Sequence, residues 1–250
     1  MSDAGEVLLT LYGREMSDAG EVLLTLYGRE MSDAGEVLLT LYGRIEALGP
    51  AAAQALAAVF GLRVQEYVYC EACALETHKH SYTQYFYNTQ ATGLREARRE
   101  RGSGVKMGAL LRGIEEQARK TCDQDAGGCN TLLPVVHALL GAPHVFTLQL
   151  AWESHREEAH NIAATMAAVD ERVDLHAVYR GVNPGQHVYR LRSLVCYYGA
   201  HYFAFVLLPE LGAWVMFDDT RVSRVGAWAD VRRKCEAGRI QPSVLFYEQV

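Results

Sequence analysis

The fold of this chain is decided by residues 189–222, whose sequence is YRLRSLVCYYGAHYFAFVLLPELGAWVMFDDTRV. His201 stands at the start of one aromatic, β-prone run, and Asp218 and Asp219 close a second such run. Two antiparallel strands joined by a short turn bring the start of the first beside the end of the second. The spacing therefore predicts that His201 lies next to Asp218 or Asp219. A carboxylate that orients an imidazole supplies two of the three members of a catalytic triad.

The same segment resembles the histidine box of ubiquitin-specific proteases, which are cysteine peptidases. That box consists of a Tyr-x-Leu strand, a glycine turn, Gly-His-Tyr, a Trp-x-x-Phe-Asp-Asp strand and a closing Leu-Phe-Tyr strand. The matching segments here are Tyr189 to Val195, Gly199 to Tyr202, Trp214 to Asp219 and Leu245 to Tyr247. The Cys-Tyr-Tyr-Gly-x-His-Tyr form of the box and Gln241-Pro242 are closest to the plant ubiquitin carboxyl-terminal hydrolase-related branch. The resemblance runs from about residue 48 to Val250.

The resemblance implies an α+β fold of the papain-like, ubiquitin-specific protease type, with a mainly antiparallel sheet. Residues 46–250 would form a partial catalytic domain, with β "fingers" at about 62–135 and a "palm" at about 140–250. The helical "thumb" that precedes the fingers in the family is expected to be missing. Independently of the resemblance, strands outnumber helices and neighbouring strands look hairpin-linked, which also favours α+β.

The spacing of apolar residues and the residues that end helices and strands predict the individual elements. Helices are expected at 49–60, ended by Gly61, and at 107–120, 160–173 and 228–236, and strands at 62–69, 82–88, 144–152 and 243–248. Residues 93–106 are basic and spotted with glycine, so we expect a solvated loop or helix end there.

The first 45 residues consist of a repeat. MSDAGEVLLTLYGRE occupies residues 1–15, recurs at 16–30, and recurs again at 31–44 before Ile45 breaks the identity. The unit is shorter than the repeats of solenoid proteins. We expect this triplicated segment to be disordered or an artefact of gene assembly. The alternative is a short amphipathic helix around Val7 to Leu11 that serves as an oligomerisation arm, although the repeated glycines weaken a helix.

Four cysteines form two pairs that suit a structural zinc site. Cys70 and Cys73 have the tight spacing of a metal knuckle, and Cys122 and Cys129 are separated by a looser loop. Thiolates on two facing turns make a tetrahedral zinc site. In the family, a zinc ribbon of this kind lies at the tip of the fingers, which grip ubiquitin. His78 and His80 are alternative ligands, and a ribbon that has lost its metal is the competing interpretation.

The resemblance assigns the base role to His201 and the orienting role to Asp218, with Asp219 as an assisting neighbour. The family's nucleophile lies in an Asn-x-Cys box, and this chain contains no such box. Cys196 alternates with apolar residues in a predicted strand, and Cys235 lies in a predicted helix, so we expect both to be packed thiols. Only Ala200 separates Gly199 from His201, which shortens a loop that helps to hold the substrate in the family.

Composition limits the remaining function classes. The formal charge of −6 gives no reason to expect nucleic acid, and no apolar run approaches the ~20 residues needed to span a bilayer. Six cysteines without a secretory signal suit a reducing compartment, so we expect a cytoplasmic or nuclear protein.

We therefore expect a deubiquitinase-family protein whose partners are ubiquitin and ubiquitinated proteins, with no cofactor for catalysis. In the family, the bond cleaved is the one after the last glycine of ubiquitin. We expect this chain to be inactive alone, because it lacks the cysteine box. The alternative is a catalytically dead module that binds ubiquitin or scaffolds other proteins.

Overall fold

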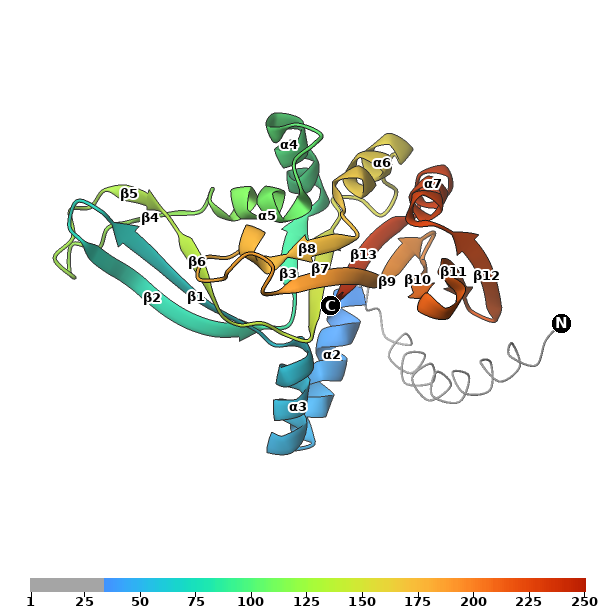
Figure 1. Ribbon diagram of the computed structural model, residues 1–250, viewed down its shortest axis with the longest axis horizontal. Coiled ribbons are helices and arrows are strands. Elements are labelled where there is room, and N and C mark those ends of the chain that lie inside the picture. Colours follow the sequence, from blue (N-terminus) through green and yellow to red (C-terminus); the bar gives the residue numbers. More distant parts are fainter. Residues whose placement is uncertain (1–33) are drawn as a thin grey trace.

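The computed structural model describes residues 34–250 as a twisted sheet with helices on both faces and a long β-projection at one end (Figure 1). The helices are α2 (Ala34–Ala47), α3 (Pro50–Phe60), α4 (Ala91–Arg101), α5 (Met107–Glu115), α6 (Ala159–Ala168) and α7 (Trp228–Gly238). The projection contains β1 (Leu62–Cys70), β2 (Leu75–Gln84), β4 (Arg119–Thr121), β5 (Leu132–Pro134) and β6 (Val136–Gly141). No helix in these residues is both long and apolar enough to cross a membrane.

The large sheet contains eight strands in this part of the chain. They are β3 (Tyr87–Gln90), β7 (Val145–Ala151), β8 (Arg172–Asp174), β9 (Val188–Tyr198), β10 (His201–Leu208), β11 (Ala213–Asp218), β12 (Arg221–Gly226) and β13 (Gln241–Gln249). The order is β12-β11-β10-β9-β13-β7-β3, with β8 beside β9, and only β3 and β7 pair in parallel. The expected α+β architecture with a mainly antiparallel sheet is confirmed.

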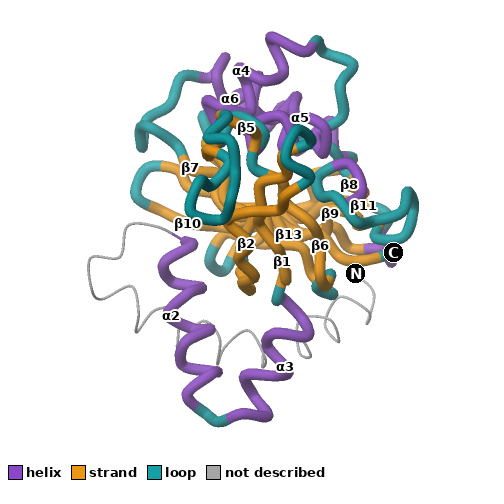
Figure 2. The backbone as a smooth tube through the Cα atoms, turned by 90° about the vertical axis from the view of Figure 1, so that its left-hand side faces the viewer, coloured by secondary structure: helices purple, strands orange, loops and turns teal. Residues whose placement is uncertain are grey.

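Both faces of this sheet are covered, because its middle strands are apolar on both sides. Adjacent residues of β13 point to opposite faces, so Leu245 joins the main core and Val244 joins a second core. Helices α4 to α7 lie over the main core, whereas α2 and α3 project from the other side of the sheet (Figures 1 and 2). The second core comprises Ala34, Tyr42, Leu56, Phe86 and Val244, with Leu38, Ile45, Phe60, Tyr85, Val195, Tyr202 and Phe246 packed against it.

The projection is built from residues 62–84 and 119–141, whereas residues 87–115, which lie inside the range expected for the fingers, belong to the body of the protein. Strands β2, β1 and β6 form a three-stranded antiparallel sheet, and β4 pairs with β5 as a ribbon. The prediction of a single strand at 82–88 is wrong, because Tyr85 and Phe86 lie between two separate strands. There the chain leaves the projection at β2 and enters the large sheet at β3, and Phe86 is buried in the second core.

Three helices differ from their sequence predictions. Helix α5 ends at Glu115 rather than at 120, and residues 119–121 form strand β4 instead. The basic segment after residue 90 begins with a complete helix, α4, because Ala91, Leu94 and Ala97 form a buried stripe that its charged residues obscure. Helix α6 ends at Ala168 rather than at 173. Val169 has extended backbone angles, yet only 3% of its surface is exposed. It is apolar because it packs in the core, and the sequence prediction mistook this for a continuation of the helix.

Residues 34–44 of the third copy of the repeat are helical. Helix α2 begins inside it at Ala34 and crosses the expected domain boundary at residue 45. Tyr42 is 5% exposed and packs against three aromatic rings, those of Phe60, Tyr85 and Phe86. The expectation of disorder therefore fails for residues 34–45. The first two copies and residues 31–33 lie outside the described residues.

Gly61 ends α3 and starts β1, and its missing side chain is required there. A Cβ atom at this position would lie 2.4 Å from the carbonyl oxygen of Ala57. We expect Gly61→Ala to lower the free energy of unfolding by about 1–3 kcal/mol, measured by urea denaturation, because backbone atoms cannot move aside cheaply. Gly93→Ala is the control. Its Cβ would meet nothing closer than 3.9 Å, so this variant should be at least as stable as the parent. Equal stability of the two variants would contradict the packing argument.

Candidate functional site

A histidine and a carboxylate meet at one end of two neighbouring strands. Strands β10 and β11 pair antiparallel, with Ala204 opposite Phe217, so the start of β10 lies beside the end of β11. This places His201 Nε2 2.6 Å from Asp218 Oδ1 and 4.0 Å from Asp219 Oδ2. The structure thus brings together the three residues that the sequence singled out, and it selects Asp218 as the direct partner.

Two tight turns fix these positions. Gly199 and Ala200 connect β9 to β10, with Tyr198 opposite His201, and both turn residues have positive φ angles (58° and 68°). Such two-residue hairpins match the twist of the flanking strands. Asp219 follows β11 directly in a left-handed conformation (φ 49°), which aspartate tolerates better than most residues. The short turn at 199–200 agrees with the shortened loop that the sequence predicted.

The hydrogen bond determines which imidazole nitrogen is free to act as a base. A carboxylate has only acceptor lone pairs, so at 2.6 Å the Nε2–H of His201 donates to Asp218. The remaining nitrogen, Nδ1, then carries the basic lone pair. The His201 side chain is 41% exposed and its ring stacks on Phe203, so this nitrogen belongs to a partly open, partly apolar site. The arrangement can accept and return a proton at Nδ1.

The four cysteines that the sequence groups as a zinc site converge at the far end of the projection. We call Cys70, Cys73, Cys122 and Cys129 the ribbon cysteines. Their sulfur atoms all lie within 4.8 Å of one another, and the Sγ atoms of Cys70 and Cys129 are 3.6 Å apart. A zinc ion with four thiolate ligands at about 2.3 Å puts neighbouring sulfurs about 3.8 Å apart. The cluster of Cys70, Cys73, Cys122 and Cys129 could therefore bind a structural zinc ion with little rearrangement.

The loose spacing of the second cysteine pair is compensated by hydrogen bonds. The amide of Asn130 donates to the carbonyl of Cys122, and the amide of Gly128 donates to the carbonyl of Asp123, which folds the loop back on itself. Gly128 passes so close that a Cβ atom there would lie 2.4 Å from the Cys122 sulfur. His78 bonds to the carbonyl of Thr121, and His80 stacks on Tyr82, so neither belongs to the cluster of sulfurs.

The thiols of this cluster have unequal acidities. Hydrogen bonding to Thr131 lowers the pKa of Cys129 to about 6, whereas thiol contacts from Cys129 and Cys70 raise the pKa of Cys73 to about 12. A thiolate is the form that binds a metal. Cys129, which is exposed, is therefore the ligand that is ready at neutral pH.

The other two cysteines face each other in the main core. Cys196 of β9 and Cys235 of α7 are both fully buried, and burial, together with the contact from Cys235, raises the pKa of Cys196. A thiol in this state is a poor nucleophile. All six cysteines of the chain are thus accounted for, and the cluster that contains His201 includes none of them.

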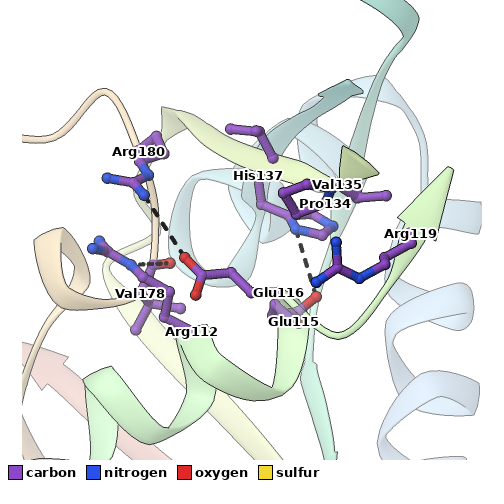
Figure 3. A pocket seen from close by; sticks show the side chains of 10 residues that line it. Arg112, Glu115, Glu116, Arg119, Pro134, Val135, His137, Val178 and Arg180 are labelled. Carbon is purple, nitrogen blue, oxygen red and sulfur yellow. Dashed lines mark hydrogen bonds and ion pairs between the residues drawn. The ribbon is translucent and has the colours of Figure 1, made fainter. Parts of the chain in front are cut away.

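A polar cavity that the sequence did not predict lies between α5 and the base of the projection. Its volume is about 350 Å³, and Arg112, Glu115, Glu116, Arg119, His137 and Arg180 contribute its charged lining (Figure 3). Arg112 donates to the carbonyls of His176, Val178 and Tyr179, which anchors α5 to the short turn that follows β8. Neither His201 nor Asp218 lines this cavity.

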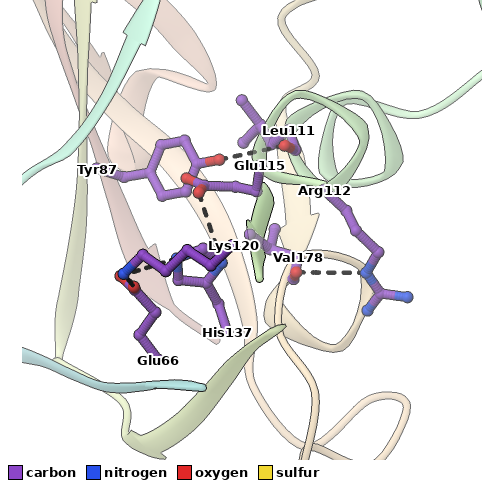
Figure 4. A network of polar contacts seen from close by, with 8 residues as sticks. All are labelled: Glu66, Tyr87, Leu111, Arg112, Glu115, Lys120, His137 and Val178. Atoms are coloured by element: carbon purple, nitrogen blue, oxygen red, sulfur yellow. Dashed lines mark hydrogen bonds and ion pairs between the residues drawn. The ribbon is translucent and has the colours of Figure 1, made fainter. Parts of the chain in front are cut away.

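Beside the cavity, an ion-pair network joins three elements of the projection to α5. The imidazole of His137 on β6 lies 3.8 Å from Glu66 on β1 and 3.6 Å from Glu115 on α5, and Lys120 on β4 pairs with Glu66 (Figure 4). These residues are far apart in sequence, and no local motif marks them. The network connects the base of the projection to α5.

Comparison with solved structures identifies the fold. The chain superimposes on a structure of the SAGA DUB module bound to monoubiquitin with a TM-score of 0.60 and 19% identity, covering 93% of this chain and 51% of the matched chain. A second structure of that module gives a TM-score of 0.56 and 15% identity, covering 88% of this chain and 49% of the matched chain. Both matches support the same fold at low sequence identity.

Comparison of sequences identifies the family. Ubiquitin carboxyl-terminal hydrolase 54 of Mus musculus is 26% identical over 197 residues, which are 75% of this chain but 12% of that protein, and the Rattus norvegicus protein gives the same values. The chain thus spans about an eighth of the length of these relatives. Both relatives are rodent proteins, so closeness to the plant branch stays a prediction. A family model described as "Ubiquitin carboxyl-terminal hydrolase" matches residues 16–247. The chain therefore belongs to the ubiquitin carboxyl-terminal hydrolase family, a family of cysteine deubiquitinases.

Proposed function

We propose that this chain supplies the acid–base half of a thiol-dependent deubiquitinase site, which cleaves the bond after the C-terminal glycine of ubiquitin. The observation that carries the proposal is the 2.6 Å contact between His201 and Asp218. Support also comes from the family match and from the solved structure with monoubiquitin bound, which has the same fold.

The proposed chemistry uses His201 twice. Its Nδ1 takes the proton of a cysteine thiol, and the thiolate then attacks the carbonyl carbon of the last glycine of ubiquitin. As the C–N bond breaks, the same nitrogen returns the proton to the leaving amine. In the second half, Nδ1 takes a proton from water, which attacks the thioester, and the thiolate leaves. Asp218 holds the Nε2–H tautomer and stabilises the imidazolium throughout.

The thiol in this scheme is not one of the six cysteines described above, because four cluster in the ribbon and two are buried in the core. The intact mass of the protein isolated from its source, with peptide mapping of its N-terminus, tests this point. A mass above 27.8 kDa with a cysteine box upstream supports the proposal. A mass of 27.8 kDa, with the repeat peptides present, would mean that the protein has no cysteine box, and this result would contradict the proposed hydrolysis.

In a form that carries the thiol, we expect His201→Gln to lower kcat on a ubiquitin amide reporter by about 10²–10⁴-fold. The Kd for ubiquitin should stay within a factor of about three, because the imidazole acts in the chemical step. Asp218→Asn should also lower kcat, since an amide partner no longer selects the productive tautomer.

Asp219→Asn is the matched control for this pair. The Asp219 side chain is 80% exposed and 4.0 Å from the imidazole, so its loss should cost far less than the loss of Asp218. A larger effect at Asp219 than at Asp218 would move the orienting role to Asp219. Unchanged turnover in His201→Gln would remove the assignment of the base.

The second candidate function is ubiquitin binding without cleavage. It is favoured by the core position of Cys196 and Cys235, which leaves the 250-residue chain without a reactive thiol beside His201. We expect this chain to bind ubiquitin in a titration monitored by calorimetry and to show no turnover of a ubiquitin amide reporter. Turnover that an alkylating reagent abolishes would show that one of these six thiols is a nucleophile after all.

We also propose that the ribbon cysteines hold one zinc ion. Elemental analysis of the purified chain should find about one zinc per molecule, because a Cys₄ set at this spacing matches tetrahedral coordination. Cys73→Ser should lose the metal and expose the tip of the projection to proteases. Cys235→Ala, which changes a cysteine outside the cluster, should retain it. Full zinc occupancy in Cys73→Ser, or none in the parent chain, would refute the site.

A further inference from the structure

Helix α2 occupies a defined docking surface on the second core. This α2 docking surface consists of Leu56 and Phe60 of α3, Tyr85, Phe86, Val244 of β13 and Gln149 of β7. Tyr42 is the centre of the contact, with ring centroids 5.1 Å from Phe60, 5.4 Å from Tyr85 and 5.6 Å from Phe86. The first turn of α2 also lies close to β7, because a Cβ atom on Gly35 would lie 2.3 Å from the Gln149 side chain.

Almost every α2 residue that makes these contacts belongs to the repeat. Residues 15–29 and 30–44 are identical, so Ala19, Gly20, Leu23 and Tyr27 of the second copy correspond to Ala34, Gly35, Leu38 and Tyr42 of the third. The glycine that permits the close approach to β7 is therefore present in both copies. A segment with the same sequence can make the same contacts on the same surface.

We propose that the second copy, residues 16–30, docks on the α2 docking surface in place of the third copy, within the same molecule. Residues 32–49 then form the connection to α3 at Pro50. Longer connections cost entropy only slowly with length, so this exchange is accessible. The first copy needs a connection longer by one more repeat, which makes the second copy the preferred replacement.

Two residues beyond the repeat explain why the third copy occupies the surface in the intact protein. Ile45 packs against the second core, and Glu46 accepts a hydrogen bond of 2.5 Å from the Tyr85 hydroxyl. With the second copy docked, Glu30 and Met31 take these two positions. A carboxylate then replaces an apolar side chain and the hydrogen bond is lost, so the second copy is a weaker occupant but a competent one.

The exchange has a structural consequence for the histidine strand. Tyr202, next to His201, packs against the second core that α2 covers. Any damage to the third copy would otherwise uncover this aromatic surface. A spare copy of the same helix keeps it covered, so the repeat acts as a built-in replacement for the helix that supports the site.

The test compares one substitution in two backgrounds of the full chain. Tyr42→Ala removes the central ring of the third copy, and a large aromatic truncation in a core lowers the Tm of a chain of this size by about 10 °C. With the first two copies intact, we expect the observed loss to be at most about half of that. When Tyr42→Ala is added to a Tyr12→Ala, Tyr27→Ala background, no copy is intact, and the full loss should appear.

Leu56→Ala is the matched control, because Leu56 lies on the docking surface and outside the repeat. It should lower the Tm equally in both backgrounds, and Tyr12→Ala with Tyr27→Ala should by itself change nothing. If the triple variant does not fold, while Tyr42→Ala does, the proposal is also supported. The milder Tyr42→Leu then provides the comparison of Tm values.

Three outcomes overturn the proposal. The first is an equal loss of Tm for Tyr42→Ala in both backgrounds. The second is no loss in either background, which would mean that α2 contributes nothing. The third is rescue accompanied by a dimer or larger species of Tyr42→Ala in light scattering, because the replacing helix would then come from a second molecule.

Discussion

The whole structure depends on one constraint, which is that the central strands of the large sheet are apolar on both faces. Leu245 and Val244 are neighbours on β13, fully buried, and belong to different cores. A sheet of this kind is stable only when both faces are covered. Helices α4 to α7 cover one face, and the pair α2–α3 covers the other. The site residues lie at the margin of this buried sheet, where the strands end.

The position of the site follows from strand pairing. His201 and Asp218 are seventeen residues apart in the sequence. The register of β10 against β11 brings their side chains to a hydrogen-bonding distance of 2.6 Å. A shift of that register by one residue would turn His201 to the other face of the sheet. The apolar side chains of both strands oppose such a shift, so the packing that stabilises the fold also maintains the geometry of the dyad.

The projection illustrates a different principle, since little of it is buried. Its tip is organised by the four cysteines and by backbone hydrogen bonds in the loop between Cys122 and Cys129. Its base is joined to α5 by the network around His137, where two carboxylates flank one imidazole. Small or exposed β-structures need such cross-links, because they bury too little apolar surface to be rigid on their own.

The sequence by itself determined the fold class, the strand that carries His201, the identity of its carboxylate partners and the grouping of the cysteines, because each leaves a local pattern. Alternation, turn residues and spacing are properties of neighbouring residues in the chain. The tertiary structure decided what depends on distant contacts. It chose Asp218 over Asp219, formed α4 despite its basic sequence, and linked Glu66 to Glu115 through His137. It also formed helix α2 from residues 34–47, because the aromatic surface of α3 and the sheet is what stabilises that helix.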